Sequence, residues 1–205
     1  MREKLLKGLK SQKIDESAAD GLLAYVELLN KWNKTYNLTA VRDPGEMITL
    51  HILDSLTALP YLKGSRILDV GTGAGLPGIP LALVRPDINF TLLDTNGKKT
   101  RFVEHAVRQL GLGNVTVVKS RIEEYRPDDE SGFDTVISRA FTALDGFADA
   151  CGRFLSDGGQ LTAMKGRLQN EEISCVNEAQ WSITSSQVVV PGLEAERHMI
   201  VLTPK

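Results

Sequence analysis

Apolar and polar residues alternate in two different ways along the chain, and the change falls near Gly64. In the first part, apolar side chains recur at steps of three, four and seven residues, at Leu22, Val26, Leu29 and Tyr36. This spacing is typical of amphipathic helices and predicts two or three of them. Ser17 and Asp20 stand three residues apart at the start of this run, an arrangement that resembles a capping box at a helix start.

Beyond Gly64, short apolar stretches with strand character alternate with helical stretches. Strands are predicted at 66–70, 89–94, 115–119, 134–138 and 159–164. Helices are predicted at 98–110, 142–155 and 170–179, and an antiparallel pair of strands at 184–190 and 198–203. Such alternation indicates a parallel sheet covered by helices on both faces. We therefore expect a helical extension over 1–63 and a Rossmann-like domain over 64–205, together forming one compact unit.

Composition narrows the class of protein further. Of the 205 residues, 42% are hydrophobic and 24% are charged, which suits a soluble protein with one buried core. The two cysteines lie far apart and the histidines do not cluster, so neither a disulfide framework nor a zinc site is indicated. The sequence has no run of about eighteen apolar residues that would predict a membrane span. We expect a cytoplasmic, monomeric protein without a bound metal.

The most informative motif is a strand that ends in a glycine-rich loop, Ile67-Leu-Asp-Val-Gly-Thr-Gly-Ala-Gly-Leu-Pro-Gly78. Glycines adopt positive φ and let the backbone approach a ligand closely, so this loop indicates a nucleotide site at the carboxyl edge of a sheet. Gly73, Gly75 and Gly78 also match the spacing of the dinucleotide fingerprint. An NAD-dependent oxidoreductase is therefore one candidate function.

Two details of the loop favour S-adenosylmethionine over a dinucleotide. Pro77 and Pro80 remove backbone donors from the turn where a pyrophosphate would bind. Asp69 brings a carboxylate to the loop, which favours a ligand with a sulfonium and an ammonium group over an anionic one. Asp94 ends the next strand, where an acidic side chain can accept both hydroxyls of a ribose. The residues predicted on these grounds to hold the cofactor are Asp69, Gly71, Gly73, Gly75 and Asp94.

Six motifs together resemble one family of S-adenosylmethionine-dependent methyltransferases. They are Trp32-Asn-Lys-Thr-Tyr-Asn-Leu-Thr39, His51-Ile-Leu-Asp-Ser55, Gly71-Thr-Gly-Ala-Gly-Leu-Pro-Gly-Ile-Pro80, Ile137-Ser-Arg-Ala140, Met164-Lys-Gly166 and Glu196-Arg-His198. Their order and spacing are similar to those of the bacterial 16S rRNA guanine-N7 methyltransferases, the ribosomal small subunit methyltransferase G family. The resemblance covers nearly the whole chain, although Ala74 stands where some relatives have proline. It implies an α/β class I methyltransferase fold, with a mostly parallel sheet and a terminal antiparallel strand.

The same resemblance implies particular contacts. Those to S-adenosylmethionine fall on Gly71, Leu76, Asp94, Thr95, Asn96, Ile122, Glu123 and Arg139. Arg139 is also the expected catalytic residue, bridging the cofactor and the target base. A basic pocket for the RNA is expected from Asn37, His51, Lys165 and Arg197, with Arg121 as a further substrate contact. The implied partner is 16S rRNA or a small-subunit particle.

Guanine N7 is chemically suited to such a site. Its lone pair lies in the plane of the base, and methylation removes no proton, so no strong general base is required. Catalysis then rests on alignment of the nucleophile, the methyl carbon and the sulfur at about 3–3.5 Å between the reacting atoms. An arginine that bound O6 and N7 together would block the lone pair, so the base is expected to be exposed in a loop or taken out of its stack.

The distribution of charge along the chain narrows the candidate functions further. The formal charge is only −2, which argues against a general nucleic-acid coat protein. Residues 96–121, however, hold six basic side chains and one acidic side chain, and residues 122–157 hold nine acidic and three basic ones. Such a basic block can supply salt-sensitive phosphate contacts. A non-catalytic RNA-binding module with a methyltransferase-like fold is the third candidate function.

Overall fold

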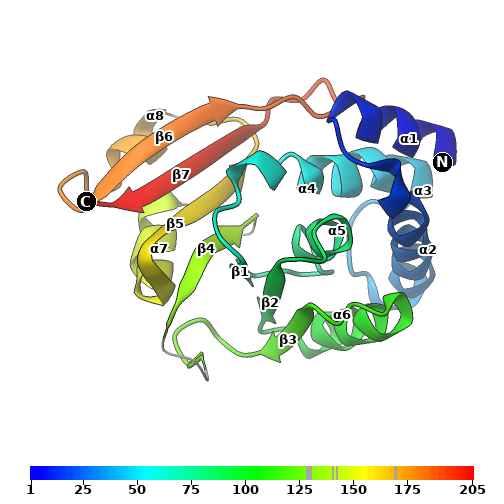
Figure 1. Ribbon diagram of the computed structural model, residues 1–205, viewed down its shortest axis with the longest axis horizontal. Helices are drawn as coiled ribbons and strands as arrows, with labels where there is room; N and C mark the ends of the chain where they lie inside the picture. The colour runs from blue at the N-terminus through cyan, green and yellow to red at the C-terminus, as the bar shows by residue number, and fades with distance from the viewer. Residues whose placement is uncertain (128–130, 140, 142, 169) are drawn as a thin grey trace.

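The computed structural model describes residues 1–127, 131–139, 141, 143–168 and 170–205. A seven-stranded sheet crosses the molecule in the order β3-β2-β1-β4-β5-β7-β6 (Figure 1). Its strands are β1 (Arg66–Val70), β2 (Asn89–Asp94), β3 (Val115–Lys119), β4 (Phe133–Ser138), β5 (Leu155–Lys165), β6 (Trp181–Gln187) and β7 (His198–Pro204). The first five run parallel, and β7 runs antiparallel to both β5 and β6. The mostly parallel sheet with a terminal antiparallel strand, predicted from the sequence, is confirmed.

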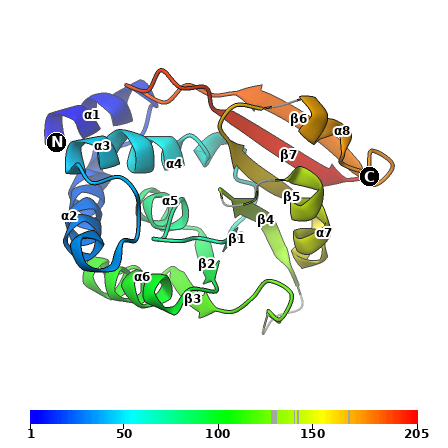
Figure 2. The ribbon, with the colours of Figure 1, turned by 180° about the vertical axis from the view of Figure 1, so that it is seen from behind.

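Both faces of the sheet are covered, as the near-continuous apolar strands require. Alternate residues of β1 point to opposite faces, so Ile67 joins one core cluster and Leu68 joins the other. The first cluster lies under α5 (Gly78–Val84), α6 (Gly97–Leu110) and the N-terminal helices. The second lies under α7 (Leu144–Cys151), and α8 (Asn170–Ser174) is seen on the same side from behind in Figure 2.

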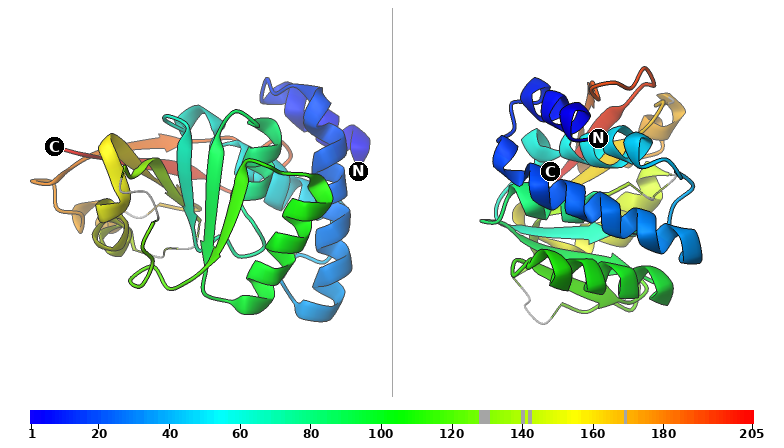
Figure 3. Two further views of the ribbon diagram at one scale, coloured as in Figure 1. Left: turned by 60° about the horizontal axis from the view of Figure 1, so that its bottom comes forward. Right: turned by 90° about the vertical axis from the view of Figure 1, so that its right-hand side faces the viewer.

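The N-terminal part is helical, as its periodicity predicts. Its elements are α1 (Arg2–Ser11), η1 (Glu16–Ala18), α2 (Ala19–Tyr36), α3 (Pro44–Met47), the π-helix η2 (Ile48–Leu53), α4 (Asp54–Leu56) and η3 (Leu59–Tyr61). In both views of Figure 3, α2 runs beside α6. Leu22 and Leu29 of α2 are fully buried in the same cluster as Phe90 of β2, so the extension and the sheet share one core.

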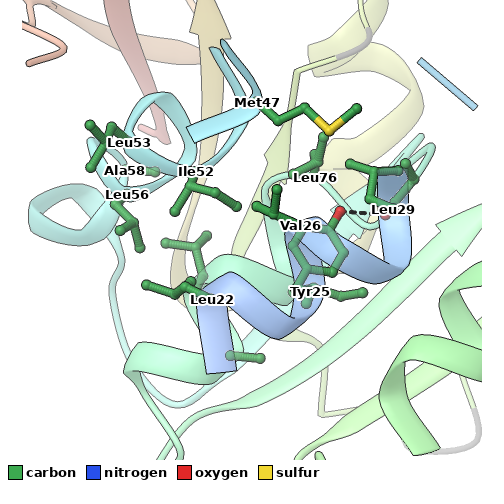
Figure 4. Close-up of a cluster of buried hydrophobic side chains, with 14 of the residues drawn as sticks. Leu22, Tyr25, Val26, Leu29, Met47, Ile52, Leu53, Leu56, Ala58 and Leu76 are labelled. Atoms are coloured by element: carbon green, nitrogen blue, oxygen red, sulfur yellow. Dashed lines mark hydrogen bonds between the residues drawn. The ribbon is translucent and has the colours of Figure 1, made fainter. Parts of the chain in front are cut away.

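Tyr25 ties this extension to the glycine loop. Its ring lies among the buried side chains of α2 (Figure 4), and its hydroxyl donates a hydrogen bond of 2.7 Å to the carbonyl oxygen of Ala74. Complete burial raises the pKa of Tyr25, so the phenol remains a donor at any working pH. The N-terminal helices thereby hold one side of the loop in place.

The capping box predicted at Ser17 and Asp20 is wrong. The side chain of Asp15 instead accepts a hydrogen bond of 2.7 Å from the backbone N–H of Ser17 and caps the short turn η1. The longer helix α2 follows at Ala19 without a side-chain cap, and Asp20 pairs with Arg2 of α1. An Asp two residues earlier thus satisfies the first free N–H group, and the extra turn shifts the helix start.

Element boundaries also differ from the prediction. The helix expected at 142–155 runs only over α7, because Leu155 already begins the long strand β5. Thr142, its expected first residue, and Ala140 of the fourth-strand motif lie outside the described residues. Helix α8 is shorter than the expected 170–179, and β6 begins three residues before the expected 184.

Candidate active site

Two cavities open at the edge of the sheet where the parallel strands end. Strand β1 pairs with β2 on one side and with β4 on the other, so the crossover direction of the chain reverses there. Ligands of open α/β sheets bind in the crevice at such a switch point. The glycine loop follows β1 at this point, and both cavities are built around the residues that follow the other strands.

The glycine loop adopts the conformations that its sequence predicts. Gly71, Gly73 and Gly75 all have positive φ, at 70°, 61° and 89°. A side chain at Gly75 would also meet Ile79, because its Cβ would lie 2.5 Å from the Cδ1 atom. Side chains here would therefore strain the backbone and push the loop away from the underlying core.

Asp69 holds this loop from below. Its Oδ2 accepts hydrogen bonds of 2.7 Å from the hydroxyl of Thr72 and 2.9 Å from the backbone N–H of Gly78. The residue has no exposed surface, and burial raises its pKa to about 6. The sequence predicts that Asp69 attracts the cationic cofactor directly. In the structure its carboxylate instead binds the loop and the start of α5, and it does not line either cavity.

We expect Gly78→Ala to destabilise the protein, because the new Cβ would lie 2.1 Å from the Cδ2 atom of buried Leu92 and 2.8 Å from Oδ2 of Asp69. Overpacking of this kind typically costs about 1–3 kcal/mol. Urea unfolding measures the change. Gly113→Ala is the matched control, because its Cβ would meet no atom within 4 Å. Equal stability of the two variants would contradict this account of the loop.

The first cavity, which we call the cofactor cavity, has a volume of about 330 Å³. It is lined by Val70, Gly71, Leu93, Asp94, Thr95, Ser120, Arg121, Ile122, Glu123 and Phe141. Five of the predicted cofactor residues therefore meet in one place: Gly71, Asp94, Thr95, Ile122 and Glu123. The cavity combines apolar walls with a carboxylate, as binding sites for small organic ligands usually do.

Asp94 is fixed by two backbone donors. The N–H of Gly73 donates to Oδ2 and the N–H of Asn96 donates to Oδ1, each at 2.8 Å. The side chain is 9% exposed and faces the cofactor cavity. Each carboxylate oxygen has a further lone pair, so Asp94 can accept the paired hydroxyls of a ribose while it holds the loop.

Arg153 holds the turn that carries Ile122 and Glu123, and the sequence analysis missed it. Its Nη2 donates to the carbonyl oxygens of both residues, at 2.6 and 3.2 Å, and its guanidinium lies 4.3 Å from the ring centre of Phe154. An arginine beyond the next strand gives no local sequence signal for such a contact.

Besides Asp69, five predicted cofactor residues do not line this cavity. Gly73 and Gly75 belong to the glycine loop, of which only Gly71 is among the lining residues. Leu76 is 5% exposed and belongs to the core. The side chain of Asn96 caps α6, since it accepts hydrogen bonds from the N–H groups of Lys98 and Lys99. Arg139 lines the second cavity instead. Arg121, predicted as a substrate contact, lines the cofactor cavity.

The second cavity, which we call the basic cavity, has a volume of about 390 Å³. It is lined by Val41, Leu50, His51, Asp54, Thr57, Arg139, Met164, Lys165, Gly166, Val188, Arg197, His198 and Met199. The structure thus brings together three of the residues that the family resemblance implies in the basic pocket, His51, Lys165 and Arg197. Arg139, expected to bridge the cofactor and the target base, lies with them. They come from the N-terminal helices and from the ends of β4, β5 and β7.

Asn37 does not line the basic cavity. It is exposed at the end of α2 with a φ of 51°, and its Oδ1 accepts a hydrogen bond of 2.6 Å from Arg42. Its neighbour Asn33 is 1% exposed, accepts from the N–H of Thr39 and donates to the carbonyl of Val41. Asn33 thereby shapes the loop that reaches the cavity wall at Val41.

Asp54 is the central residue that sequence reasoning missed. It is 4% exposed, and its two carboxylate oxygens bind the two arginines of the cavity. Oδ2 lies 3.2 Å from Nη1 of Arg139, and Oδ1 lies 2.9 Å from Nε of Arg197. The motif His51-Ile-Leu-Asp-Ser55 contains this residue, but no local pattern shows that an aspartate after a π-helix faces two distant arginines.

Lys165 connects the two cavities. Its Nζ donates a hydrogen bond of 3.1 Å to the carbonyl oxygen of Phe141, a residue of the cofactor cavity, and pairs with Glu172 at 2.8 Å. The side chain is 9% exposed. A strand-end lysine is often a solvated charge, whereas this one is held in the wall between the cavities.

His51 lies in the π-helix η2 and is buried. Its Nε2 shares a hydrogen bond of 2.8 Å with the hydroxyl of Thr39. Burial, together with the nearby charge of Arg139, lowers the pKa of His51 to about 4. The imidazole is therefore neutral at physiological pH and adds no positive charge to the basic cavity.

This pKa predicts a pH dependence of stability. The unfolded chain takes up a proton at His51 below about pH 6.5, whereas the folded chain does so only near pH 4, so acidification favours unfolding. We expect the free energy of unfolding to fall by up to about 3 kcal/mol, relative to His51→Gln, between pH 7 and 4. Urea titrations of both proteins at several pH values measure this difference. The comparison is needed because Asp69, with its raised pKa, has the opposite effect.

The residues present fit S-adenosylmethionine better than a dinucleotide. The backbone N–H of Gly78, which would receive a phosphate at the start of α5, already donates to the buried carboxylate of Asp69. A phosphate there would meet a negative charge. The cofactor cavity instead offers Asp94 for a ribose and Ile122 for the face of a base.

Two further kinds of feature are absent from the described part of the chain. No cluster of three or more metal-ligating side chains occurs among these residues. No helix among them has the length and hydropathy needed to cross a membrane.

Comparisons with known proteins agree with this geometry. Solved structures with the same fold include an O-methyltransferase from Bacillus cereus in complex with SAH, with a TM-score of 0.61 and 16% identity over 89% of this chain and 91% of that one. A SAM-dependent methyltransferase from Aquifex aeolicus gives a TM-score of 0.58 and 19% identity, over 80% of this chain and 94% of that one. The predicted class I methyltransferase fold is confirmed.

Sequence comparison identifies the family. The family model for rRNA small subunit methyltransferase G matches residues 19–200. The relative of that name from Alkalilimnicola ehrlichii is 48% identical over 93% of this chain and 86% of its own length. The one from Klebsiella pneumoniae (strain 342) is 50% identical over 90% and 88%. The chain therefore belongs to the rRNA small subunit methyltransferase G family.

Proposed function

We propose that this protein transfers the methyl group of S-adenosylmethionine to N7 of a guanine in 16S rRNA, near the decoding site. The observation that carries the proposal is the junction of the two cavities. Arg139 in the basic cavity and Phe141 in the cofactor cavity are two residues apart, and Lys165 contacts the carbonyl of Phe141 from the basic side. A base in the basic cavity would thus lie next to a methyl donor in the cofactor cavity.

The cofactor, when bound, supplies an electrophilic methyl group on a sulfonium. The protein's part is to bind and orient. Asp94 and the turn at Ile122 and Glu123 hold the ribose and the base of the cofactor, and the glycine loop lets the backbone approach closely. Asp69 and Tyr25 keep that loop in one conformation through their hydrogen bonds to Gly78 and Ala74.

The basic cavity suits a guanine that has left its stack. Its walls combine apolar side chains such as Leu50, Met164 and Val188 with the arginines Arg139 and Arg197. An arginine that donates to O6 alone leaves the N7 lone pair free for attack on the methyl carbon. No proton is lost, so the neutral, hydrogen-bonded His51 is compatible with the reaction.

Phosphate contacts are expected outside the cavities. Lys98, Arg101 and Arg108 follow one another at steps of three and seven residues along α6, and all three are exposed. Helix α6 begins two residues after Thr95, which lines the cofactor cavity. The charges of the three basic residues suit the backbone of a structured RNA, and binding through them would weaken steeply as the salt concentration rises.

The enzyme is further proposed to work as a cytoplasmic monomer on rRNA or an assembling small-subunit particle. Light scattering during gel filtration, in the presence and absence of S-adenosylmethionine, measures the oligomeric state. A stable dimer would contradict this part of the proposal.

The direct test uses purified protein, S-adenosylmethionine with a labelled methyl group, and small-subunit RNA that lacks 7-methylguanosine. We expect label in 7-methylguanosine after digestion to nucleosides, from naked 16S rRNA or from the particle. Label in another nucleoside would overturn the assignment to N7. Cofactor-independent RNA binding would favour the non-catalytic module, and tight binding of NADH alone would favour the oxidoreductase.

A further inference from the structure

Asp54 joins three separate parts of the chain inside the basic cavity. It begins α4, directly after the π-helical turn η2. One carboxylate oxygen binds Arg139, 85 positions further along the chain, and the other binds Arg197, 143 positions further along. We call these three residues the Asp54 bridge. π-Helical turns are rare and are found frequently at functional sites.

The carboxylate of Asp54 is aimed at the cavity and not at its own helix. Oδ2 accepts a hydrogen bond from Arg139 and Oδ1 accepts one from Arg197, while the backbone carbonyl oxygen of Asp54 accepts from the hydroxyl of Thr57. The side chain is 5% exposed, whereas those of the arginines are 27% and 25% exposed. The arginines therefore keep N–H groups on the open side of the cavity, with the carboxylate behind them.

The other partners of the basic side chains in this cavity show why the negative charge of Asp54 is needed. Arg139 also donates to the carbonyl of Leu50 at 3.4 Å, and Arg197 donates to the carbonyl of Glu196 at 2.9 Å. Lys165 is paired with Glu172. Arg139 and Arg197 both bind the one carboxylate of Asp54, so without it they would lose the negative charge that they share, and like charges repel.

In the proposed reaction, the carboxylate of Asp54 also offsets the positive charge of the two arginines near the target base. As the methyl group moves, positive charge leaves the sulfur and develops on the guanine ring. Two uncompensated arginines beside the ring would oppose that charge, whereas a pair that shares one carboxylate presents a single net positive charge. The arginines can then donate to the base without a large electrostatic penalty.

We propose that Asp54 is a positioning residue for methyl transfer. Its carboxylate holds Arg139 and Arg197 in fixed positions, so that the three side chains together carry a single positive charge. The target guanine binds beside these two arginines. This inference rests on the proposed function. It assigns no contact between Asp54 and the base, because the carboxylate acts through the two arginines.

The test compares Asp54→Asn, Asp54→Glu and Asp87→Asn in methyl transfer to 16S rRNA. Asparagine keeps the shape but loses the charge, so one arginine is released. We expect kcat to fall about 10- to 100-fold, while the Kd for S-adenosylmethionine changes less than about threefold. Glutamate keeps the charge and is expected to recover part of the lost kcat. Asp87 pairs with Arg85 on the exposed surface, so its asparagine variant serves as the matched control and is expected to behave as wild type.

A double-variant comparison separates positioning from a purely structural role. Arg197→Gln and Asp54→Asn disrupt the same unit, so their combined loss of kcat is expected to be smaller than the product of the single losses. Unchanged kcat in a folded Asp54→Asn, or strictly multiplicative losses, would overturn the inference. If Asp54→Asn does not fold, the kcat of Arg197→Gln is the deciding measurement. A wild-type kcat in that variant would also overturn the inference. Failure of the wild-type protein to methylate 16S rRNA would instead refute the proposed function.

Discussion

Replacing Asp94 by alanine is expected to raise the Kd for S-adenosylmethionine about 100-fold. The carboxylate is placed to accept two ribose hydroxyls, and hydrogen bonds to a charged group contribute about 1.5–3 kcal/mol each. The same oxygens also accept from the N–H groups of Gly73 and Asn96, so their loss loosens the loop that lines the cofactor cavity. Isothermal titration calorimetry of the purified protein measures the change.

The control for this experiment is Asp94→Asn. The amide keeps one acceptor oxygen and nearly the same volume, so we expect its Kd to lie between those of the wild type and the alanine variant. Thermal unfolding of both variants shows whether the loop change has spread to the core. An unchanged Kd for Asp94→Ala would mean that the ribose does not bind at this carboxylate.

Replacing Arg139 by alanine is expected to affect a different step. Arg139 lines the basic cavity and pairs with Asp54, so its loss removes a guanidinium group from the site proposed for the target base. We expect kcat at saturating cofactor to fall about 10²- to 10³-fold, the usual effect of removing one preorganised donor at a reaction centre. The Kd for S-adenosylmethionine is expected to remain within about threefold of the wild-type value. Single-turnover assays with labelled cofactor and calorimetry measure these two quantities.

Arg85→Ala is the matched control for Arg139→Ala. Arg85 pairs with Asp87 on the surface and lines neither cavity. It is expected to leave both kcat and cofactor affinity unchanged, because exposed ion pairs contribute little. A large loss of cofactor affinity in Arg139→Ala, with kcat preserved, would instead place Arg139 at the cofactor, as the family resemblance alone implies.

The parallel strands are the part of the fold that the sequence predicts best. The runs that end at Val70 and Lys119 are rich in β-branched residues, and the run that ends at Asp94 contains phenylalanine and two leucines. All three form strands over the expected residues. The capping box fails for a physical reason. Asp15, Ser17 and Asp20 all have side chains that can cap, and only the course of the backbone decides which N–H group each one meets.

The residues of the candidate site are likewise only partly predictable from the sequence. Asp94 ends β2 and Ile122 lies three residues after the end of β3, so the topology carries both to the cofactor cavity. Asp69 has the residue type expected of a cofactor contact, but its side chain turns under the loop, and the sequence does not show which way it points. Asp54 and Arg153 act through bonds to segments far along the chain, and such contacts leave no periodic or motif signal.

Methylation of guanine N7 in 16S rRNA by this chain, through these residues, can be tested in cells. The most direct measurement is mass spectrometry of 16S rRNA from cells in which the gene has been disrupted and then supplied again as wild type or as Arg139→Ala. We predict that one 7-methylguanosine near the decoding site is lost on disruption, returns with the wild-type gene and stays absent or greatly reduced with the variant. Unchanged 7-methylguanosine after disruption would contradict the account.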